Sequence, residues 1–302
     1  MPIKKWVDVI EAPSNLGLKP PGSGREPGTC RAPDALRAAG LHTMLGARSE
    51  RRVTPPRYDP DETRATNIRN IQSISIYSRM LAAEIGASVQ SDGFPLVIGG
   101  DCSIVLGAGL ALKRLGAYGL IFIDGHTDFF LPEQSATGGA AGMDLALVTG
   151  WGPQSLTNID GMKPYFDPNN VWLVGNRDFE QRPSGAIPTA ESSGMDYWDL
   201  TRLRRTGLTI SVSERSSALA RRPINGFWIH LDVDALDDAI MPAVDSRQPD
   251  GLSWQEIRQI IVGALATGRA VGMEITIFDP DLDLNGSIAR ELARNIARWF
   301  SF

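Results

Sequence analysis

The chain has 302 residues, of which 42% are hydrophobic, and a formal net charge of −5. That length supports a large core in one domain over residues 1–302, and the scattered Lys and Arg argue against nucleic acid or an anionic membrane as partner. The sequence shows no membrane-length apolar run and no signal-type leader, and two cysteines cannot form a disulfide framework. We therefore predict a cytoplasmic location.

Strand patterns alternate with helical patterns along the chain, which predicts an α/β fold in three layers, with a mainly parallel sheet between helices. Short apolar runs predict strands at 6–10, 94–98, 120–123, 171–174, 227–232 and 270–277. Helical spacing or capping predicts helices at 32–39, 68–85, 104–115, 253–266 and 287–302, and a further helix up to residue 148. The segment 183–222 gives weak signals, with a possible strand at 208–212. The long Gly/Pro-rich loop at 13–28 is of a kind that is more often functional than idle.

The first cluster of polar residues follows the apolar run at 120–123. Asp124, His126 and Asp128 stand at two-residue intervals, so their side chains point the same way if the backbone stays extended. The carboxyl ends of parallel strands are where ligands bind in open α/β sheets, and oxygen with imidazole suits a divalent transition metal. Alone, this pattern favours a polar strand end with an N-capping Asp over a metal site.

A second cluster, Asp232 and Asp234, ends the strand at 227–232. Buried carboxylates repel each other and lose hydration, so two such clusters in one fold favour cations that neutralise them. His230 alternates with Asp232 on the same face, either beside a metal site or as a core histidine. His42 follows a helix and is predicted to lie at the surface.

Three motifs in this order resemble those of the arginase/agmatinase superfamily of ureohydrolases. GGDCS at 99–103 resembles the family's GGDHS, IDGHTD at 123–128 its DAHxD, and HLDVDALDD at 230–238 its SxDxDxxDP. GTCRAPDALRAAGL at 28–41 and MEITIFDP at 273–280 are similar to further family segments. The resemblance covers most of the chain and implies a hydrolase that cleaves the C–N bond of a small cationic guanidino substrate. It also suggests a homo-oligomer, a trimer or a hexamer.

The resemblance also implies a ligand set for two divalent ions, most often Mn²⁺, that share a bridging hydroxide. Asp128 would carry a proton to the leaving amine, and Glu274 would hold the cationic substrate by paired hydrogen bonds. Thr137 and Glu180 fall at positions expected near the substrate, although the cluster of Arg177, Asp178 and Glu180 also fits an acidic helix start. The implied ligands are Cys102 and Asp128 for one ion, His126 and Asp234 for the other, and Asp124 and Asp232 as bridges.

Cys102 departs from the family pattern, which has histidine at this position. Its functional interpretation is a thiolate ligand, which shifts the preference toward Zn, Fe or Ni; the alternative is a small buried residue beside a turn. We favour the ligand, because the other five metal positions are intact.

The loop after Asp128 also differs from the corresponding loop of arginases, which binds the amino-acid end of arginine. Phe130, Thr137, Gly139 and Ala141 stand at the matching positions here. IDGHTDF, GGAAGM and VGNRD instead resemble the N-hydroxyarginine amidinohydrolases, which also have cysteine in the first metal motif. The alternatives are hydrolysis of agmatine or guanidinobutyrate, or a member that binds metal or ligand without catalysis.

Overall fold

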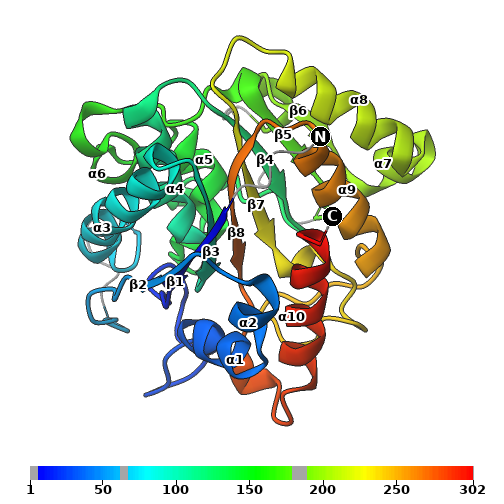
Figure 1. Ribbon diagram of the computed structural model, residues 1–302. Helices are drawn as coiled ribbons and strands as arrows, with labels where there is room; N and C mark the ends of the chain where they lie inside the picture. Colours follow the sequence, from blue (N-terminus) through cyan, green and yellow to red (C-terminus); the bar gives the residue numbers. More distant parts are fainter. Residues whose placement is uncertain (1–5, 62–66, 179–188, 302) are drawn as a thin grey trace.

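The computed structural model describes residues 6–61, 67–178 and 189–301, and its centre is an eight-stranded sheet in which every pairing is parallel (Figure 1). The strands lie in the order β2-β1-β3-β8-β7-β4-β5-β6. Their bounds are β1 Trp6–Ala12, β2 Ser49–Arg52, β3 Gly93–Gly99, β4 Gly119–Ile123, β5 Val171–Val174, β6 Asp196–Trp198, β7 Phe227–Asp232 and β8 Ala270–Thr276. The order brings β3 and β4 from the first half of the sequence beside β7 and β8 from the second half, at the middle of the sheet.

Apolar side chains cover both faces of this sheet, which explains why its central strands read as continuous apolar runs. In β4, Ile121 and Ile123 pack into the core on one face, while Leu120 and Phe122 pack into the core on the other. β7 alternates in the same way, and His230 stacks on Phe122 with ring centroids 4.3 Å apart. Polar groups of these strands therefore face a packed interior until the strands end.

Helices form one layer on each face of the sheet (Figure 1). The cluster that contains Phe122 also includes residues of α3, α4, α5 and α6, and the opposite cluster includes residues of α1, α2, α7, α8, α9 and α10. Their bounds are α1 Ala32–Ala38, α2 Leu41–Leu45, α3 Ile71–Gln90, α4 Val105–Leu115, α5 Asp144–Val148, α6 Gln154–Thr157, α7 Leu200–Thr206, α8 Leu208–Ala220, α9 Trp254–Ala266 and α10 Ser287–Trp299. Among the described residues no helix combines the length and apolar character of a membrane span.

The predicted three-layer α/β fold is confirmed, and the six predicted strands correspond to β1, β3, β4, β5, β7 and β8. The capping box predicted before α9 is present, since Ser253 Oγ accepts from the Glu256 N–H and Glu256 Oε2 accepts from the Ser253 N–H. The sequence did not reveal β2 and β6, two short strands at the sheet edges. SERR in β2 is almost entirely exposed and lacks the apolar alternation of a strand.

Two local predictions were wrong. Residues 208–212 belong to helix α8, whose buried residues Ser211, Val212, Ser216 and Leu219 recur at helical spacing. Val212 packs so closely against Gly263 of α9 that a Cβ at residue 263 would lie 2.4 Å from Val212 Cγ1. Packing between helices thus outweighs the β-branched TISV pattern. His42 is buried rather than at the surface, because α2 turns its ring toward β1, where Nε2 lies 3.3 Å from Glu11 Oε1.

Candidate metal centre

The residues of the three motifs meet at the carboxyl ends of the four central strands, β3, β8, β7 and β4. Cys102 follows β3, Asp124 follows β4, and Asp232 ends β7. Glu274 lies within β8, directly opposite His230 of β7 in the strand register. The parallel topology therefore gathers side chains that are up to about half the chain apart in sequence, for example Cys102 and Asp232.

Asp124, His126 and Asp234 form one group, in which a ligand atom from each residue lies within 4.8 Å of the others. His126 Nδ1 is 3.0 Å from Asp234 Oδ2 and 3.8 Å from Asp124 Oδ1. The backbone helps to hold the two acids: the His126 N–H donates to Asp124 Oδ1 at 2.6 Å, and the Gly125 N–H donates to Asp234 Oδ1 at 3.2 Å. These three side chains therefore share one small volume.

Gly125 fits between these side chains because it has none of its own. A Cβ there would lie 2.6 Å from Arg177 Nη1 and 2.8 Å from the Asp234 carbonyl oxygen. The Arg177 guanidinium fills the adjacent space and donates to backbone carbonyls of the segment after β7, including those of Asp234 at 3.0 Å and Gln248 at 2.9 Å. Arg177 thus fixes the turn that carries Asp234.

Asp178 fixes the turn that carries His126 and Asp128. Its buried carboxylate accepts from the Thr127 N–H at 2.8 Å and from Thr127 Oγ1 at 2.6 Å, and Asn176 Nδ2 donates to it at 3.1 Å. The chain then passes through a left-handed conformation at Asp128, where φ is 44°. The predicted substrate residue Glu180 lies outside the described residues.

Cys102 faces the same volume from the β3 side. Its Sγ lies 2.9 Å from Asp232 Oδ2 and 3.0 Å from Thr276 Oγ1. Asp101 sets the turn: its carboxylate accepts from the Ser103 N–H at 2.9 Å and from Ser14 Oγ at 2.6 Å. The loop at 13–28 therefore supports the first metal motif, and the thiol is placed against a carboxylate rather than among purely apolar neighbours.

His230 and Glu274 form a buried pair beside Cys102. His230 Nδ1 lies 2.8 Å from Glu274 Oε1, and both side chains have no exposed surface. Within the described part of the chain, His230 Nε2 and Glu274 Oε2 have no hydrogen-bond partner. Of the two sequence interpretations of His230, a core histidine with both nitrogens satisfied does not match this geometry.

Asp144 is a member of the site that sequence reasoning missed. It is fully buried at the start of α5, and it forms a second group of possible metal ligands with Cys102 and His230, again with atoms within 4.8 Å. Neither of its carboxylate oxygens makes a hydrogen bond of normal geometry among the described residues. The sequence feature that could have indicated Asp144 is its position as the single acid at the start of the otherwise apolar run DLALV at 144–148.

The electrostatics of the site reflect unneutralised buried charge. Burial, followed by repulsion from neighbouring acids, raises the pKa of Asp124, Asp128 and Asp232 well above their usual range. Burial also raises the pKa of the Cys102 thiol, and the nearby carboxylates add to the effect. At Asp144 too, burial and the Asp124 charge raise the pKa.

Among the described residues, His230 pairs with Glu274, and His126 is the histidine in the group with Asp124 and Asp234. Burial alone would lower its pKa, but the charge and hydrogen bond of Asp234 together with Asp124 raise it to about 9. Burial alone would raise the pKa of Asp234, but His126 lowers it. One histidine therefore compensates one carboxylate, and the remaining acids need another source of positive charge.

The side chains fit divalent metal ions. Four buried residues carry donor atoms without hydrogen-bond partners in the described ranges: Asp124 Oδ2, both oxygens of Asp144, His230 Nε2 and Glu274 Oε2. Buried polar atoms are nearly always satisfied, so such a concentration indicates a missing partner, and carboxylate, imidazole and thiolate are ligands of first-row transition metals.

Thr137 does not lie in this cluster of contacts. Its side chain is exposed, and its Oγ1 accepts from the Gly139 N–H at 3.1 Å, which shapes the glycine-rich loop itself. That loop is fastened to the loop at 13–28, since the Ala141 N–H donates to the Gly17 carbonyl at 3.1 Å. A Cβ at Gly139 would lie 2.7 Å from the same carbonyl oxygen, which explains the glycine.

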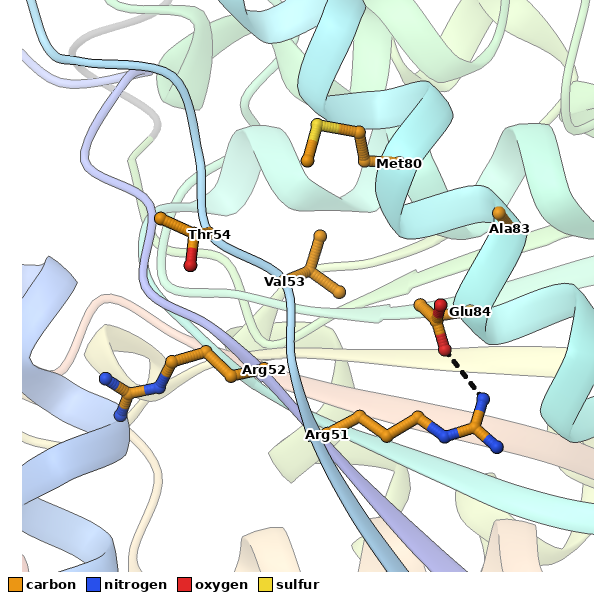
Figure 2. Close-up of a pocket in the computed structure, with 7 residues that line it drawn as sticks. All are labelled: Arg51, Arg52, Val53, Thr54, Met80, Ala83 and Glu84. Carbon is orange, nitrogen blue, oxygen red and sulfur yellow. Dashed lines mark hydrogen bonds and ion pairs between the residues drawn. The ribbon is translucent and has the colours of Figure 1, made fainter.

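A hollow of about 540 Å³ lies elsewhere, between the end of β2 and helix α3 (Figure 2). Its lining includes Arg51, which pairs with Glu84 at 2.6 Å, and the apolar Val53 and Met80. None of the motif residues lines it. The hollow therefore does not contribute to the site described above.

Comparison with known proteins agrees with the fold and the motifs. The profile of the Arginase family matches residues 7–301. Arginase of Staphylococcus aureus (strain MRSA252) is 27% identical over 98% of this chain and 97% of its own length, and arginase of Bacillus subtilis (strain 168) is 28% identical over 97% of both. The solved arginase of Bacillus caldovelox superposes with a TM-score of 0.86 at 25% identity over 99% of each chain.

The fold and the cluster of ligands thus define a hydrolase of the binuclear metal-dependent type, acting on C–N bonds of linear amidines. The chain belongs to the arginase family. A lower similarity, which bears on the fold alone, extends to proclavaminate amidino hydrolase of Streptomyces clavuligerus, with a TM-score of 0.71 at 18% identity.

Proposed function

We propose that this protein uses two divalent metal ions to hydrolyse a guanidino compound to urea or hydroxyurea, with an N-hydroxyarginine-type substrate favoured. The observation that carries the proposal is the pair of buried ligand groups, one containing His126 and one containing Cys102, at the carboxyl ends of the central strands. In the proposed ligand set, Cys102, Asp128, Asp124 and Asp232 would hold one ion, and His126, Asp234, Asp124 and Asp232 would hold the other.

Bound ions of this kind lower the pKa of water and so supply a hydroxide nucleophile at neutral pH. The chain's own groups account for the remaining requirements. Asp128 is buried among acids that raise its pKa, which suits a carboxyl that takes up a proton and passes it to the leaving amine. Glu274 has one oxygen engaged by His230 and one without a described partner, and that free Oε2 is the proposed acceptor for the guanidinium.

The charge of the site supports a cationic or weakly basic substrate. Asp124, Asp128, Asp144, Asp232, Asp234 and Glu274 are all buried at this edge of the sheet, so two divalent ions leave the site negatively charged when these acids are ionised. Thiolate ligation adds negative charge and makes the ions weaker Lewis acids. An N-hydroxylated guanidine, which is less basic and more readily cleaved, suits such a centre.

The loop after Asp128 argues against ordinary L-arginine as substrate. Phe130 packs against the hydrophobic core, and Ala141 is buried, so neither offers a polar group to an amino-acid head. Gly139 has no side chain, and Thr137 Oγ1 is engaged within the loop. The same observation favours a second candidate, hydrolysis of a substrate without an amino-acid head, such as agmatine or guanidinobutyrate.

Mn²⁺ is the proposed metal on family grounds, and Cys102 makes Zn, Fe or Ni the alternatives. The homo-oligomer, a trimer or hexamer, and the cytoplasmic location remain predictions. Sedimentation of the purified protein tests the first of these two directly.

Product analysis by mass spectrometry tests the proposal. Manganese-loaded protein is given arginine, N-hydroxyarginine, agmatine and guanidinobutyrate together, with Cys102→His alongside the wild type. Hydroxyurea formed well before urea supports the N-hydroxyarginine assignment, and urea with an amine product moves it to the second candidate. No product from protein that holds two metal ions contradicts both and leaves a family member that binds metal without this activity.

A further inference from the structure

Cys102, Asp144 and His230 bring three different donor types together on one side of the site. We propose that the ion on the Cys102 side is bound by Cys102 Sγ, a carboxylate oxygen of Asp144 and Nε2 of His230. Asp144 and His230 lie outside the six ligands assigned above. The inference rests on the proposed function in one respect, that Cys102 is a metal ligand.

The spacing of the three donors suits a single ion. All three ligand atoms lie within 4.8 Å of one another, and all three side chains are buried. Donor atoms bound to one first-row ion at about 2.0–2.3 Å lie roughly 3–4.5 Å apart, depending on whether they are adjacent or opposite. Small side-chain rotations therefore suffice to close the group around an ion, and Asp232, whose Oδ2 is 2.9 Å from Cys102 Sγ, remains within reach as a bridge.

Glu274 prepares His230 as a ligand. Glu274 Oε1 lies 2.8 Å from His230 Nδ1, and the tautomer in which Nδ1 donates to this carboxylate is the one that leaves the lone pair on Nε2 for a metal ion. Metal-binding histidines usually donate their other nitrogen to a carboxylate in this way. Stacking on Phe122 fixes the plane of the ring. Nε2 itself has no partner among the described residues, which is the condition of a ligand without its ion.

Asp144 is the independent second indication. A fully buried carboxylate ordinarily accepts several hydrogen bonds, yet both of its oxygens lack one in the described ranges. Leaving such a charge unsatisfied is costly, and no lysine or arginine forms an ion pair with it among those residues. A cation beside Cys102 and His230 satisfies all three groups at once.

The donor atoms also predict a different metal preference for each of the two positions. Sulfur and imidazole nitrogen favour Zn, Fe, Co or Ni on the Cys102 side, whereas the Asp124, His126 and Asp234 group is richer in oxygen and accommodates manganese. The two positions are therefore chemically different, and the Cys102 side is the one expected to keep zinc during purification.

Cobalt(II) titration of metal-free protein tests the ligand assignment without relying on turnover, because a thiolate bound to Co²⁺ gives a charge-transfer band in the near ultraviolet. The variants are Cys102→Ser, Asp144→Asn, His230→Gln and Glu274→Gln. Asp8→Asn is the matched control, since Asp8 is a buried acid of β1 distant from the motifs along the sheet. Circular dichroism of each metal-free variant verifies folding.

We expect wild type and Asp8→Asn to bind two ions and show the band, and Cys102→Ser to lose the band. Asp144→Asn and His230→Gln should weaken binding of the band-forming ion by roughly 100-fold or more, since loss of an orienting partner alone costs about 10–100-fold. Glu274→Gln should fall within that smaller range. Binding of the other ion, at His126, should persist in all four.

The outcomes separate the two proposals. An unchanged band and affinity in both Asp144→Asn and His230→Gln overturn this inference and leave Cys102 as a ligand. A band that survives in Cys102→Ser overturns the thiolate ligand itself, and no Co²⁺ binding by the wild type overturns the proposed function. If a variant does not fold, X-ray absorption of wild-type protein with two equivalents of Co²⁺ decides: the inference requires an imidazole on both ions, not only on one.

Discussion

Buried acids occur at two places in the sheet, along β1 and at the carboxyl ends of the central strands. In β1, Glu11 accepts from Arg37 Nε at 2.9 Å and from Arg52 Nε at 2.7 Å. Burial alone would raise the pKa of Asp8, but hydrogen bonds from Arg48 and from Ser88 and Ser49 lower it. At the centre, burial and mutual repulsion raise the pKa of Asp124 and its neighbours instead.

The difference separates a structural role from a functional one. The β1 acids are compensated by arginines of the same chain, so that region is electrostatically complete. Beside the central acids the described residues supply two histidines, His126 and His230, and Arg177 donates its hydrogen bonds to backbone carbonyls. Burial of a carboxylate alone therefore predicts little; burial without a cation supplied by the chain is what indicates a site for added metal.

The first prediction is that metal ions stabilise this protein strongly through the central region. Because ions bind the folded chain, they should raise the free energy of unfolding by about 4 kcal/mol at a metal concentration of about 1,000 times Kd. Thermal unfolding of chelator-treated protein, with and without added Mn²⁺ or Zn²⁺, measures it. If neither metal changes the Tm, the central acids do not bind these ions and do not differ from the β1 acids in this respect.

The second prediction concerns Asp124→Asn. The asparagine oxygen can still accept from the His126 N–H, while an uncharged amide replaces the unpartnered Oδ2. Turnover of whichever guanidino compound the wild type cleaves should fall by roughly 100-fold or more, since even partners that only orient ligands are worth about 10–100-fold. The metal-free variant should unfold at a higher temperature than metal-free wild type, because one repelling charge is gone. A lower Tm for the metal-free variant argues against uncompensated charge.

The third prediction is the opposite behaviour at β1. Glu11→Gln should lower the free energy of unfolding by about 1–3 kcal/mol, because the buried acceptor of two arginines is weakened while those half-exposed arginines can rehydrate. Metal stoichiometry and kcat should stay at the wild-type values. Denaturant unfolding and a metal assay measure this, and loss of a bound ion in this variant would show that the two regions are not independent.

The smallest effect is a pH dependence of the metal-free protein. The folded-state pKa of His126, about 9 against 6.5 in the unfolded chain, contributes stability that is full below pH 6.5 and is lost as the pH rises to about 9. The raised pKa values of Asp124, Asp128 and Asp232 act in the same direction from about pH 3.8 upward. Tm should therefore be higher at pH 6 than at pH 9 without metal. Bound metal should remove this slope, because it holds its ligands deprotonated; the same slope with metal bound would count against the assigned ligands.

The sequence predicted the centre of the sheet well because the physical signals there are local. Buried parallel strands are apolar runs, and polar residues directly after residues 123 and 231 mark the strand ends. The parallel order then forces those ends to one edge. Edge strands lack such signals: β2 is exposed, and the three residues of β6 are too few for a pattern.

The rest of the site depends on contacts that no local pattern encodes. Asp144 opens a short helix, and the packing of α5 against α4 and α6, which no local pattern predicts, places it near Cys102. His42 was predicted at the surface because its neighbours in sequence are those of a helix end, whereas it is buried near Glu11 of β1, a residue distant from it in sequence. The role of His230 followed from strand register, since Glu274 lies opposite it in β8.

The position of β8 has a consequence for synthesis of the chain. β8, residues 270–276, is the last strand to be made, yet it lies between β3 and β7. Until it emerges from the ribosome, Cys102 belongs to a half-sheet of β2, β1 and β3, and Asp232 to a separate half-sheet of β7, β4, β5 and β6. We therefore expect a nascent chain, or a truncated product that ends before residue 270, to lack the assembled candidate site.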